Sequence, residues 1–256
     1  MGKIIALKYG KEKQIQPIFH KTMSFEKLPQ SQYYWNQCKG GAEVTDLRDC
    51  TDVDPTCGSK VYRITPIPGE SFDIFCYRDT EQRHWNLIHN RQSSAVDFFR
   101  KWTEYKTGFG DLTGNFWLGN DKIYSLVKLA PYRLRIELEA WDGTVGIAEY
   151  SDFQIGSEAD NYQLYVTGFS GNISDAMHKQ NGEMFTTKDR DHDQLSNNCA
   201  IRRHGAWWYT SCSAANLNGR YEIDTGDSNE AMAWRFFFVN RQHVPMKKAR
   251  MMIQRK

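Results

Sequence analysis

The segment Lys188–Cys212, "KDRDHDQLSNNCAIRRHGAWWYTSC", combines three patterns in twenty-five residues. Three aspartates alternate at its start, two cysteines bracket its second half, and a Trp-Trp-Tyr run precedes the second cysteine. Alternate carboxylates are typical of a metal site, paired cysteines of a disulfide, and clustered aromatic rings of a ligand surface or a core. Each pattern has a plainer alternative, so the rest of the sequence has to be weighed with it.

The aspartates are Asp189, Asp191 and Asp193. Hard oxygen ligands at alternate positions suit Ca²⁺, which takes six to eight oxygens and accepts backbone carbonyls among them. An EF-hand loop beginning at Asp189 is excluded, because its sixth position is Gln194 instead of Gly and its twelfth is Ala200 instead of Glu. By residue pattern alone, a solvated acidic turn fits equally well.

The sequence has an even number of cysteines and no Cys-X-X-Cys pair, a pattern that favours disulfides over structural zinc. They are Cys38, Cys50, Cys57, Cys76, Cys199 and Cys212. Disulfides indicate an oxidising compartment, so we expect a secreted protein. The sequence Asn172-Ile173-Ser174 is an N-glycosylation sequon and agrees with secretion. Free buried cysteines are the less favoured alternative for the pair at 199 and 212.

The run "AWWY" at 206–209 could stack on sugar rings or belong to the core. Adjacent side chains on a strand point in opposite directions, so we expect at least one of Trp207 and Trp208 to be buried. The preceding Arg202, Arg203 and His204 form a basic group that could receive an anionic ligand or simply be solvated.

The protein has 256 residues and a formal net charge of +2, too little to indicate nucleic-acid binding. It has no run of about twenty apolar residues, so we expect no membrane insertion. The first fourteen residues do not form a proper signal peptide, and we interpret the sequence as one whose leader is absent. Residues 1–46 are expected to be an upstream segment or linker. No nucleophile with a recognisable elbow accompanies a histidine, so we do not expect an enzyme.

Periodicity predicts strands at 61–65, 72–76 and 85–89, and a helix from Ser93 or Ser94 to Gly108. A second helix is expected to be capped by Asn120 and to end before Pro131. Residues 132–140 alternate apolar and charged side chains, and Asp142-Gly143 follows, which predicts a hairpin with 144–150. Regular periodicity then fails between Gly171 and Trp234, and such a long irregular stretch is normally functional or held by metal and disulfide.

Together these residues resemble the fibrinogen C-terminal (fibrinogen-related) domain of ficolins, tachylectins, tenascins, angiopoietins and fibrinogen itself. The resemblance covers about residues 47–253, within a domain that we assign to residues 47–256, and rests on ordered motifs. They include "DLRDC" (46–50), "SAVDFFRKWTEYKTGFGDLTGNFWLGNDKIYSL" (94–126), "FTTKDRDHD" (185–193), "NNCA" (197–200), "GAWWYTSC" (205–212) and "ANLNGRY" (215–221). It implies an α+β fold: a twisted antiparallel sheet with short helices and a long loop-rich calcium and ligand region.

The resemblance also implies disulfides Cys50–Cys76 and Cys199–Cys212. Cys38 and Cys57 lie outside the family pattern and could pair with each other, or Cys38 could link two copies of the protein. For calcium, the resemblance selects the side chains of Asp191 and Asp193 and the backbone carbonyls of Leu195 and Asn197, with Asp189 as an outer partner.

In the lectin members of this family, a pocket beside an often cis bond before the second cysteine binds acetyl groups with a histidine and several tyrosines. Here Ser213 replaces that histidine, Arg203 stands where tyrosine is common, and Asn229 occupies another aromatic position. Basic residues near such a pocket favour a carboxylate or sulfate. The candidate ligand-binding residues are Arg203, Trp207, Ser211, Cys212, Ser213 and Asn229.

The function implied is a secreted, calcium-binding recognition domain, a glycan-binding lectin of innate immunity with an anion-preferring pocket. The alternative is a signalling domain that binds a cell-surface receptor or matrix protein. We expect the full-length protein to be a homo-oligomer, because lectins of this sort depend on avidity.

Overall fold

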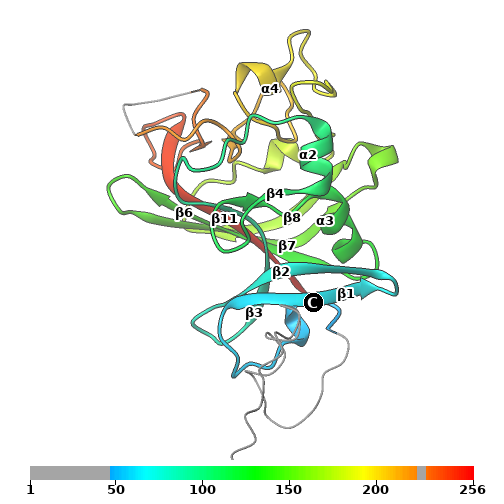
Figure 1. The fold of residues 1–256 in the computed structure, drawn as a ribbon. Helices are drawn as coiled ribbons and strands as arrows, with labels where there is room; N and C mark the ends of the chain where they lie inside the picture. The colour runs from blue at the N-terminus through cyan, green and yellow to red at the C-terminus, as the bar shows by residue number, and fades with distance from the viewer. Residues whose placement is uncertain (1–46, 224–228) are drawn as a thin grey trace, which may run out of the picture.

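The computed structural model describes residues 47–223 and 229–256, and a twisted antiparallel sheet runs through its middle (Figure 1). The strand order along the main path is β1-β2-β3-β11-β6-β7-β8. These strands span Lys60–Ile67, Glu70–Arg78, His84–Arg91, Val244–Arg255, Tyr132–Ala140, Val145–Ile155 and Leu164–Gly171 in that order. The expected α+β class and antiparallel sheet are confirmed.

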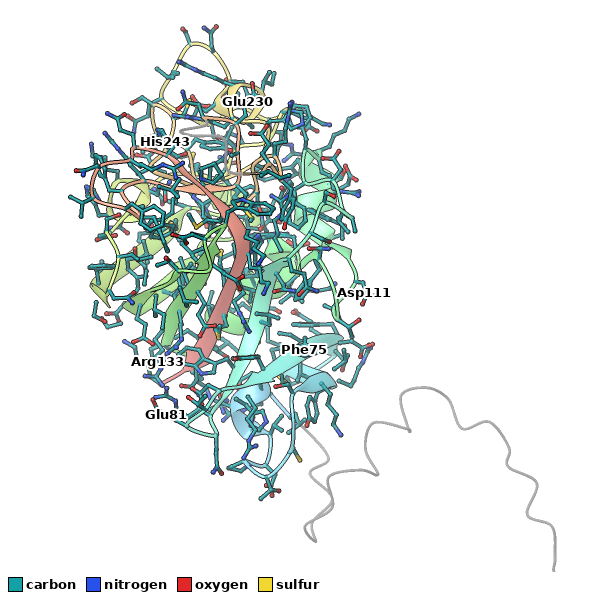
Figure 2. All side chains as sticks on the ribbon, turned by 90° about the vertical axis from the view of Figure 1, so that its left-hand side faces the viewer. Phe75, Glu81, Asp111, Arg133, Glu230 and His243 are labelled. Atoms are coloured by element: carbon teal, nitrogen blue, oxygen red, sulfur yellow. A yellow bond between two sulfur atoms is a disulfide. The ribbon has the colours of Figure 1, made fainter. Side chains whose placement is uncertain are left out.

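The last strand, β11, lies between β3 and β6 and pairs with both in antiparallel register. Because both edges of β11 are paired, its central residues lie in the interior of the sheet, and Met251, Met252 and Ile253 are all buried. This strand runs from the loop-rich end of the molecule, near His243, toward the opposite end, near Arg133 (Figure 2). It therefore ties the irregular region to the β1–β3 end of the sheet.

The hairpin predicted at Asp142-Gly143 is confirmed as the connection from β6 to β7. Gly143 has φ +88° and donates its N–H to the carbonyl of Ala140 at 3.0 Å. The side chains of β6 alternate between buried and half-buried, as the sequence pattern predicted.

The predicted helix at 93–107 is correct only in its second half, since helix α2 spans Trp102–Thr107. Before it, the Asn115 Oδ1 accepts from the backbone N–H groups of Gln92 and Ser93, and the Asp97 Oδ1 accepts from Phe99 N–H. Such side-chain bonds compete with helical hydrogen bonds and hold this segment in turns. Neither candidate serine caps the helix, because its N-cap is Lys101.

Helix α3 spans Asn120–Val127, with Gly119 as its N-cap at φ +110°. The prediction that Asn120 is the cap is therefore wrong by one residue. The Asn120 side chain is fully buried, and its Oδ1 accepts from Trp117 Nε1 at 3.0 Å. The Asn120 side chain therefore bonds to Trp117 within the core and does not cap the helix.

From Gly171 to Trp234 the backbone is irregular, as expected, apart from short elements. These are η3 His178–Gln180, α4 Cys199–Arg202, β9 Ala215–Asn216 and β10 Ala233–Trp234. The remaining short elements are η1 Cys50–Asp52, β4 Phe109–Gly110, β5 Phe116–Trp117 and η2 Glu158–Asp160. An aromatic core lies beneath this region: the ring of Trp117 is 6.0 Å from Phe185, 6.5 Å from Trp207 and 6.2 Å from Trp208.

The two predicted disulfides, Cys50–Cys76 and Cys199–Cys212, are both present. Cys57 is also disulfide-bonded, whereas Cys38 lies outside the described residues, so its predicted pairing stays open. The proposed upstream segment 1–46 lies outside them as well. Among residues 47–223 and 229–256, no helix is long and apolar enough to cross a membrane.

Candidate functional site

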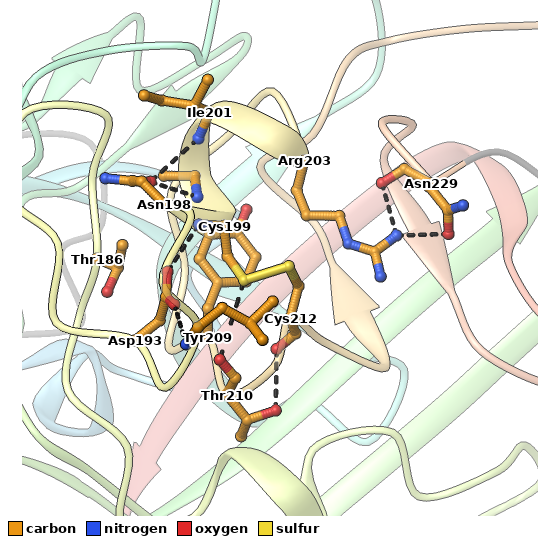
Figure 3. The surroundings of a disulfide bond; sticks show 12 residues. Thr186, Asp193, Asn198, Cys199, Ile201, Arg203, Tyr209, Thr210, Cys212 and Asn229 are labelled. Carbon is orange, nitrogen blue, oxygen red and sulfur yellow. Dashed lines mark hydrogen bonds between the residues drawn. A yellow bond between two sulfur atoms is a disulfide. The ribbon is translucent and has the colours of Figure 1, made fainter.

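The loop that carries the calcium candidates is joined directly to the Cys199–Cys212 bridge. Asp193 accepts from Leu195 N–H at 2.8 Å with one carboxylate oxygen and from Cys199 N–H at 2.7 Å with the other. Asp191 in turn accepts from Asp193 N–H at 3.2 Å. A carboxylate that bridges its own loop and the bridge cysteine couples the two parts of the site (Figure 3).

Within the described residues, neither Asp191 nor Asp193 forms an ion pair with a basic side chain, and the two carboxylates lie close enough for their charges to interact. Burial raises the pKa of Asp193 above its ordinary value, and the neighbouring Asp191 carboxylate raises it further. A cation between such groups relieves both effects. The two carboxylates and the expected backbone carbonyls of Leu195 and Asn197 are hard oxygen donors, the kind of ligand that Ca²⁺ takes.

The expected calcium ligands include main-chain oxygens and are not a cluster of acidic side chains alone. In the part of the protein that the structure describes, no group of three or more His, Cys, Asp or Glu side chains is placed to hold a metal. Half of the candidate ligands are main-chain oxygens, as the resemblance implies. The residues present therefore fit a calcium ion only if those carbonyls take part.

Asp189, the expected outer calcium partner, has a different task in the structure. Its Oδ1 accepts from Trp102 N–H at 2.9 Å, at the first residue of α2, and from Thr187 Oγ1 at 2.8 Å. A carboxylate at this position satisfies an N–H that has no partner within the helix. Of the three alternating aspartates, the first is thus an anchor for α2.

Helix α4 begins at the bridge cysteine and is capped from the calcium loop. The Asn198 Oδ1 accepts from Ala200 N–H at 2.7 Å and from Ile201 N–H at 3.1 Å. The short helix ends at Arg202, and the next residue, Arg203, donates its N–H to the carbonyl of Cys199 at 2.8 Å. The position of Arg203 is therefore set by the bridge and the cap together.

The side chain of Arg203 reaches across to the segment that resumes at Asn229. Its Nη1 donates to the Asn229 carbonyl at 3.0 Å and to the Asn229 Oδ1 at 2.5 Å (Figure 3). Within the described ranges, no carboxylate forms an ion pair with Arg203, and its buried Nε has no hydrogen-bond partner. The sequence prediction that Arg203 and Asn229 belong to one site agrees with this contact.

Two further polar atoms are buried without a hydrogen-bond partner among the described residues: Ser213 Oγ, directly after Cys212, and Arg235 Nε. Of these two residues, Arg235 lies close enough to Arg203 for its charge to act on it. Burial lowers the pKa of Arg203 below its ordinary value, and the nearby charges of Arg202 and Arg235 lower it further. A desolvated cation beside other cations favours an anion at this place.

The remaining ligand candidates divide into exposed and buried groups. The bond between Ser211 and Cys212 is cis, as the resemblance implies, and Ser211 is exposed while Cys212 is buried. Trp207 and Trp208 are both 0% exposed, which confirms that at least one is core. Of the two alternatives for this run, a stacking surface and core packing, the full burial of Trp207 favours core packing.

Two features of this end of the molecule escaped the sequence reasoning. Arg235 approaches Arg203 because Arg235 N–H donates to the carbonyl of Ala214 at 2.8 Å, a contact that joins distant segments and leaves no local signal. The run "FFFV" at 236–239 presents Phe236 and Val239, which are 41% and 89% exposed. Its unusual density of apolar residues between Arg235 and Asn240 could have been noticed.

Comparisons with known proteins agree with this fold. The family model for the C-terminal globular domain of fibrinogen beta and gamma chains matches residues 46–256. Human ficolin-3 is 42% identical over 163 residues, which is 63% of this chain and 54% of that protein. Human angiopoietin-related protein 7 is 41% identical over 167 residues, 64% of this chain and 48% of that protein. The match thus spans about half the length of these curated relatives.

Solved structures give the same picture. The fibrinogen-like globe domain of human ANGPTL2 superimposes with a TM-score of 0.76 at 34% identity, covering 82% of this chain and 99% of that one. A lamprey fibrin D-dimer, complexed with the peptide Gly-His-Arg-Pro-amide, has a TM-score of 0.75 at 26% identity over 91% of this chain and 79% of its own.

Proposed function

Because the protein belongs to the family of fibrinogen C-terminal globular domains, we propose that it is an extracellular recognition domain that binds an anionic group of a glycan beside Cys199–Cys212. The observation that carries this proposal is Arg203, a desolvated guanidinium with no carboxylate partner among the described residues and an unpartnered Nε. The disulfides support an extracellular site of action. The proposed activity is binding and requires no catalytic group.

Arg203 suits a carboxylate or sulfate because a guanidinium presents its donors in a planar fork. Arg203 Nη1 donates to the carbonyl and the Oδ1 of Asn229, and these two hydrogen bonds keep the guanidinium in one orientation. The unpartnered Ser213 hydroxyl supplies a further donor, and Arg235 adds positive charge. We assign the anionic group of a sialic acid or sulfated sugar to this place, with Ser211 and Cys212 on its border.

Calcium in this proposal is structural. When bound, Ca²⁺ would supply positive charge to Asp191 and Asp193 and to the carbonyls of Leu195 and Asn197. Asp193 accepts a hydrogen bond from Cys199 N–H, and the Cys199 carbonyl accepts one from Arg203 N–H. Through these two hydrogen bonds, a rigid calcium loop also fixes the position of the ligand-binding arginine. Calcium removal is therefore expected to weaken ligand binding without any contact between ion and ligand.

A protein ligand is the second candidate, and the exposed loop at 236–239 favours it. Phe236 and Val239 are largely open to solvent, and the Arg235 guanidinium lies 4.8 Å from the Phe236 ring centroid. Exposed aromatic and arginine side chains of this kind are frequent in protein interfaces. The partner would be a receptor or matrix protein.

A glycan and receptor-ectodomain array, probed with oligomerised domain, tests both candidates. We expect sialylated or sulfated glycans to be bound in calcium, and Arg203→Ala to abolish that binding. Arg202→Ala is the matched control for charge: it removes one exposed positive charge near the site but no contact with Asn229, so it should weaken binding less than Arg203→Ala does. If Arg203→Ala left binding to anionic glycans unchanged, the first candidate would be refuted. Binding to a protein that is lost in Phe236→Ser would support the second.

A further inference from the structure

The sequon Asn172-Ile173-Ser174 begins directly after β8, and its asparagine is exposed. Asn172 N–H donates to the carbonyl of Ile147 at 3.1 Å, and its Oδ1 accepts from Ile147 N–H at 2.7 Å. These two bonds fix the side chain through its oxygen. Among the described residues nothing binds Asn172 Nδ2, which is the atom that carries an N-linked sugar.

The rest of the sequon is attached to the loop that follows β10. Ser174 Oγ donates to the carbonyl of Arg235. Ile173 and Phe237 both press on Gly146: a Cβ there would lie 2.6 Å from Ile173 Cγ2 and 2.3 Å from Phe237 Cε2. The sequon and the 235–237 segment are therefore immediate neighbours.

Exposed apolar side chains flank these contacts. Val145, which precedes Gly146, is 56% exposed, and Phe236, which precedes Phe237, is 41% exposed. With Val239 at 89%, these are exposed apolar side chains on the two segments that meet at Gly146. We call these three residues the 145/236/239 surface.

We propose that Asn172 carries an N-linked glycan whose inner sugars lie beside the 145/236/239 surface and partly shield it. The sequon is the one Asn-X-Ser/Thr sequence in the protein, so one glycan per molecule is expected. The donor is a lipid pyrophosphate-linked oligosaccharide. Asn172 Nδ2 bonds to the sugar C1 and loses a proton, the C1–O bond to the pyrophosphate breaks, and the lipid pyrophosphate leaves with the electron pair.

The attachment is tested by secreting the 256-residue sequence from eukaryotic cells behind a heterologous signal peptide and measuring the intact mass. We expect a single glycan, removable by peptide N-glycosidase. It should be absent from Asn172→Asp and Ser174→Ala and present in Ser174→Thr. Asn172→Asp keeps an oxygen for Ile147 N–H and is the chemical product of enzymatic deglycosylation, so folding is controlled for. A secreted protein with the mass of the bare polypeptide would overturn the proposal.

The location is tested by fluorescence of a hydrophobic dye before and after deglycosylation. We expect more dye to bind once the glycan is removed, and Val239→Ser to suppress that increase. If removal left dye binding unchanged while Val239→Ser lowered it, the glycan would not shield this surface. The proposal shares with the proposed function only passage through the secretory pathway, and its readouts are mass and dye instead of ligand binding, so each can fail separately.

Discussion

Replacing Asp193 by Asn separates the two roles of this carboxylate: its hydrogen bonds to the backbone and its proposed binding of calcium. Its oxygens accept from Leu195 N–H and Cys199 N–H, and an amide can accept only one of these bonds. One half-buried donor is left without a partner, which costs about 1–3 kcal/mol. Loss of a calcium ion present at a hundred times its dissociation constant costs about 2.7 kcal/mol more.

Urea unfolding in calcium and in chelator measures both costs, that of the unpartnered donor and that of the lost calcium ion. In calcium, Asp193→Asn is expected to lower the free energy of unfolding by about 4–6 kcal/mol, and in chelator by only about 1–3 kcal/mol. The calcium-dependent part should thus vanish in the variant.

The matched control is Asp189→Asn, which removes the same charge nearby but keeps an oxygen for Trp102 N–H. It should retain the full calcium-dependent stabilisation. If Asp193→Asn gained as much stability from calcium as the wild type, the assignment of Asp193 as a ligand would be refuted.

Three further predictions concern the domain around the site. Trp207→Ala should lower the free energy of unfolding in urea by about 3–5 kcal/mol, because the ring is fully buried. The folded fraction of the variant should keep its ligand affinity. A loss of affinity without a loss of stability would show that Trp207 contacts the ligand and is not simply part of the core. Joint replacement of Cys199 and Cys212 by Ser should cost about 3 kcal/mol by the same method, and no change would argue against the bridge as a staple. Burial lowers the pKa of His89 from 6.5 to about 3. Between pH 6.5 and pH 5 the histidine therefore takes up a proton in the unfolded state but not in the folded state. This uptake should lower the free energy of unfolding by about 2 kcal/mol over that range. His89→Gln should lack that part of the pH dependence, and an unaltered pH profile would count against it.

The parts of the fold that sequence predicted well are those with local signals. The β6–β7 hairpin follows from strict alternation and a turn at Asp142-Gly143. The cysteine pairing at Cys50–Cys76 and Cys199–Cys212 came from a family resemblance, since spacing alone leaves the connectivity of several cysteines open.

The errors have physical causes that local patterns do not contain. Residues 93–101 have helical periodicity, but distant Asn115 takes up the N–H groups of Gln92 and Ser93. Trp207 and Trp208 are both buried, because the rings of both pack against Trp117 in the aromatic core. Contacts such as that of Arg235 with Ala214 depend on the assembled fold.

Arg203 is expected to bind an anionic glycan group in a site ordered by calcium. The decisive measurement is calorimetric titration with sialyllactose and a sulfated disaccharide, using wild type and Arg203→Ala in calcium and in chelator. Loss of a charge-assisted hydrogen bond worth about 1.5–3 kcal/mol predicts about 10- to 150-fold weaker binding by Arg203→Ala. Chelator should weaken wild-type binding as well. Equal affinity of wild type and Arg203→Ala for an anionic glycan, with or without calcium, would show that Arg203 does not bind the anionic group.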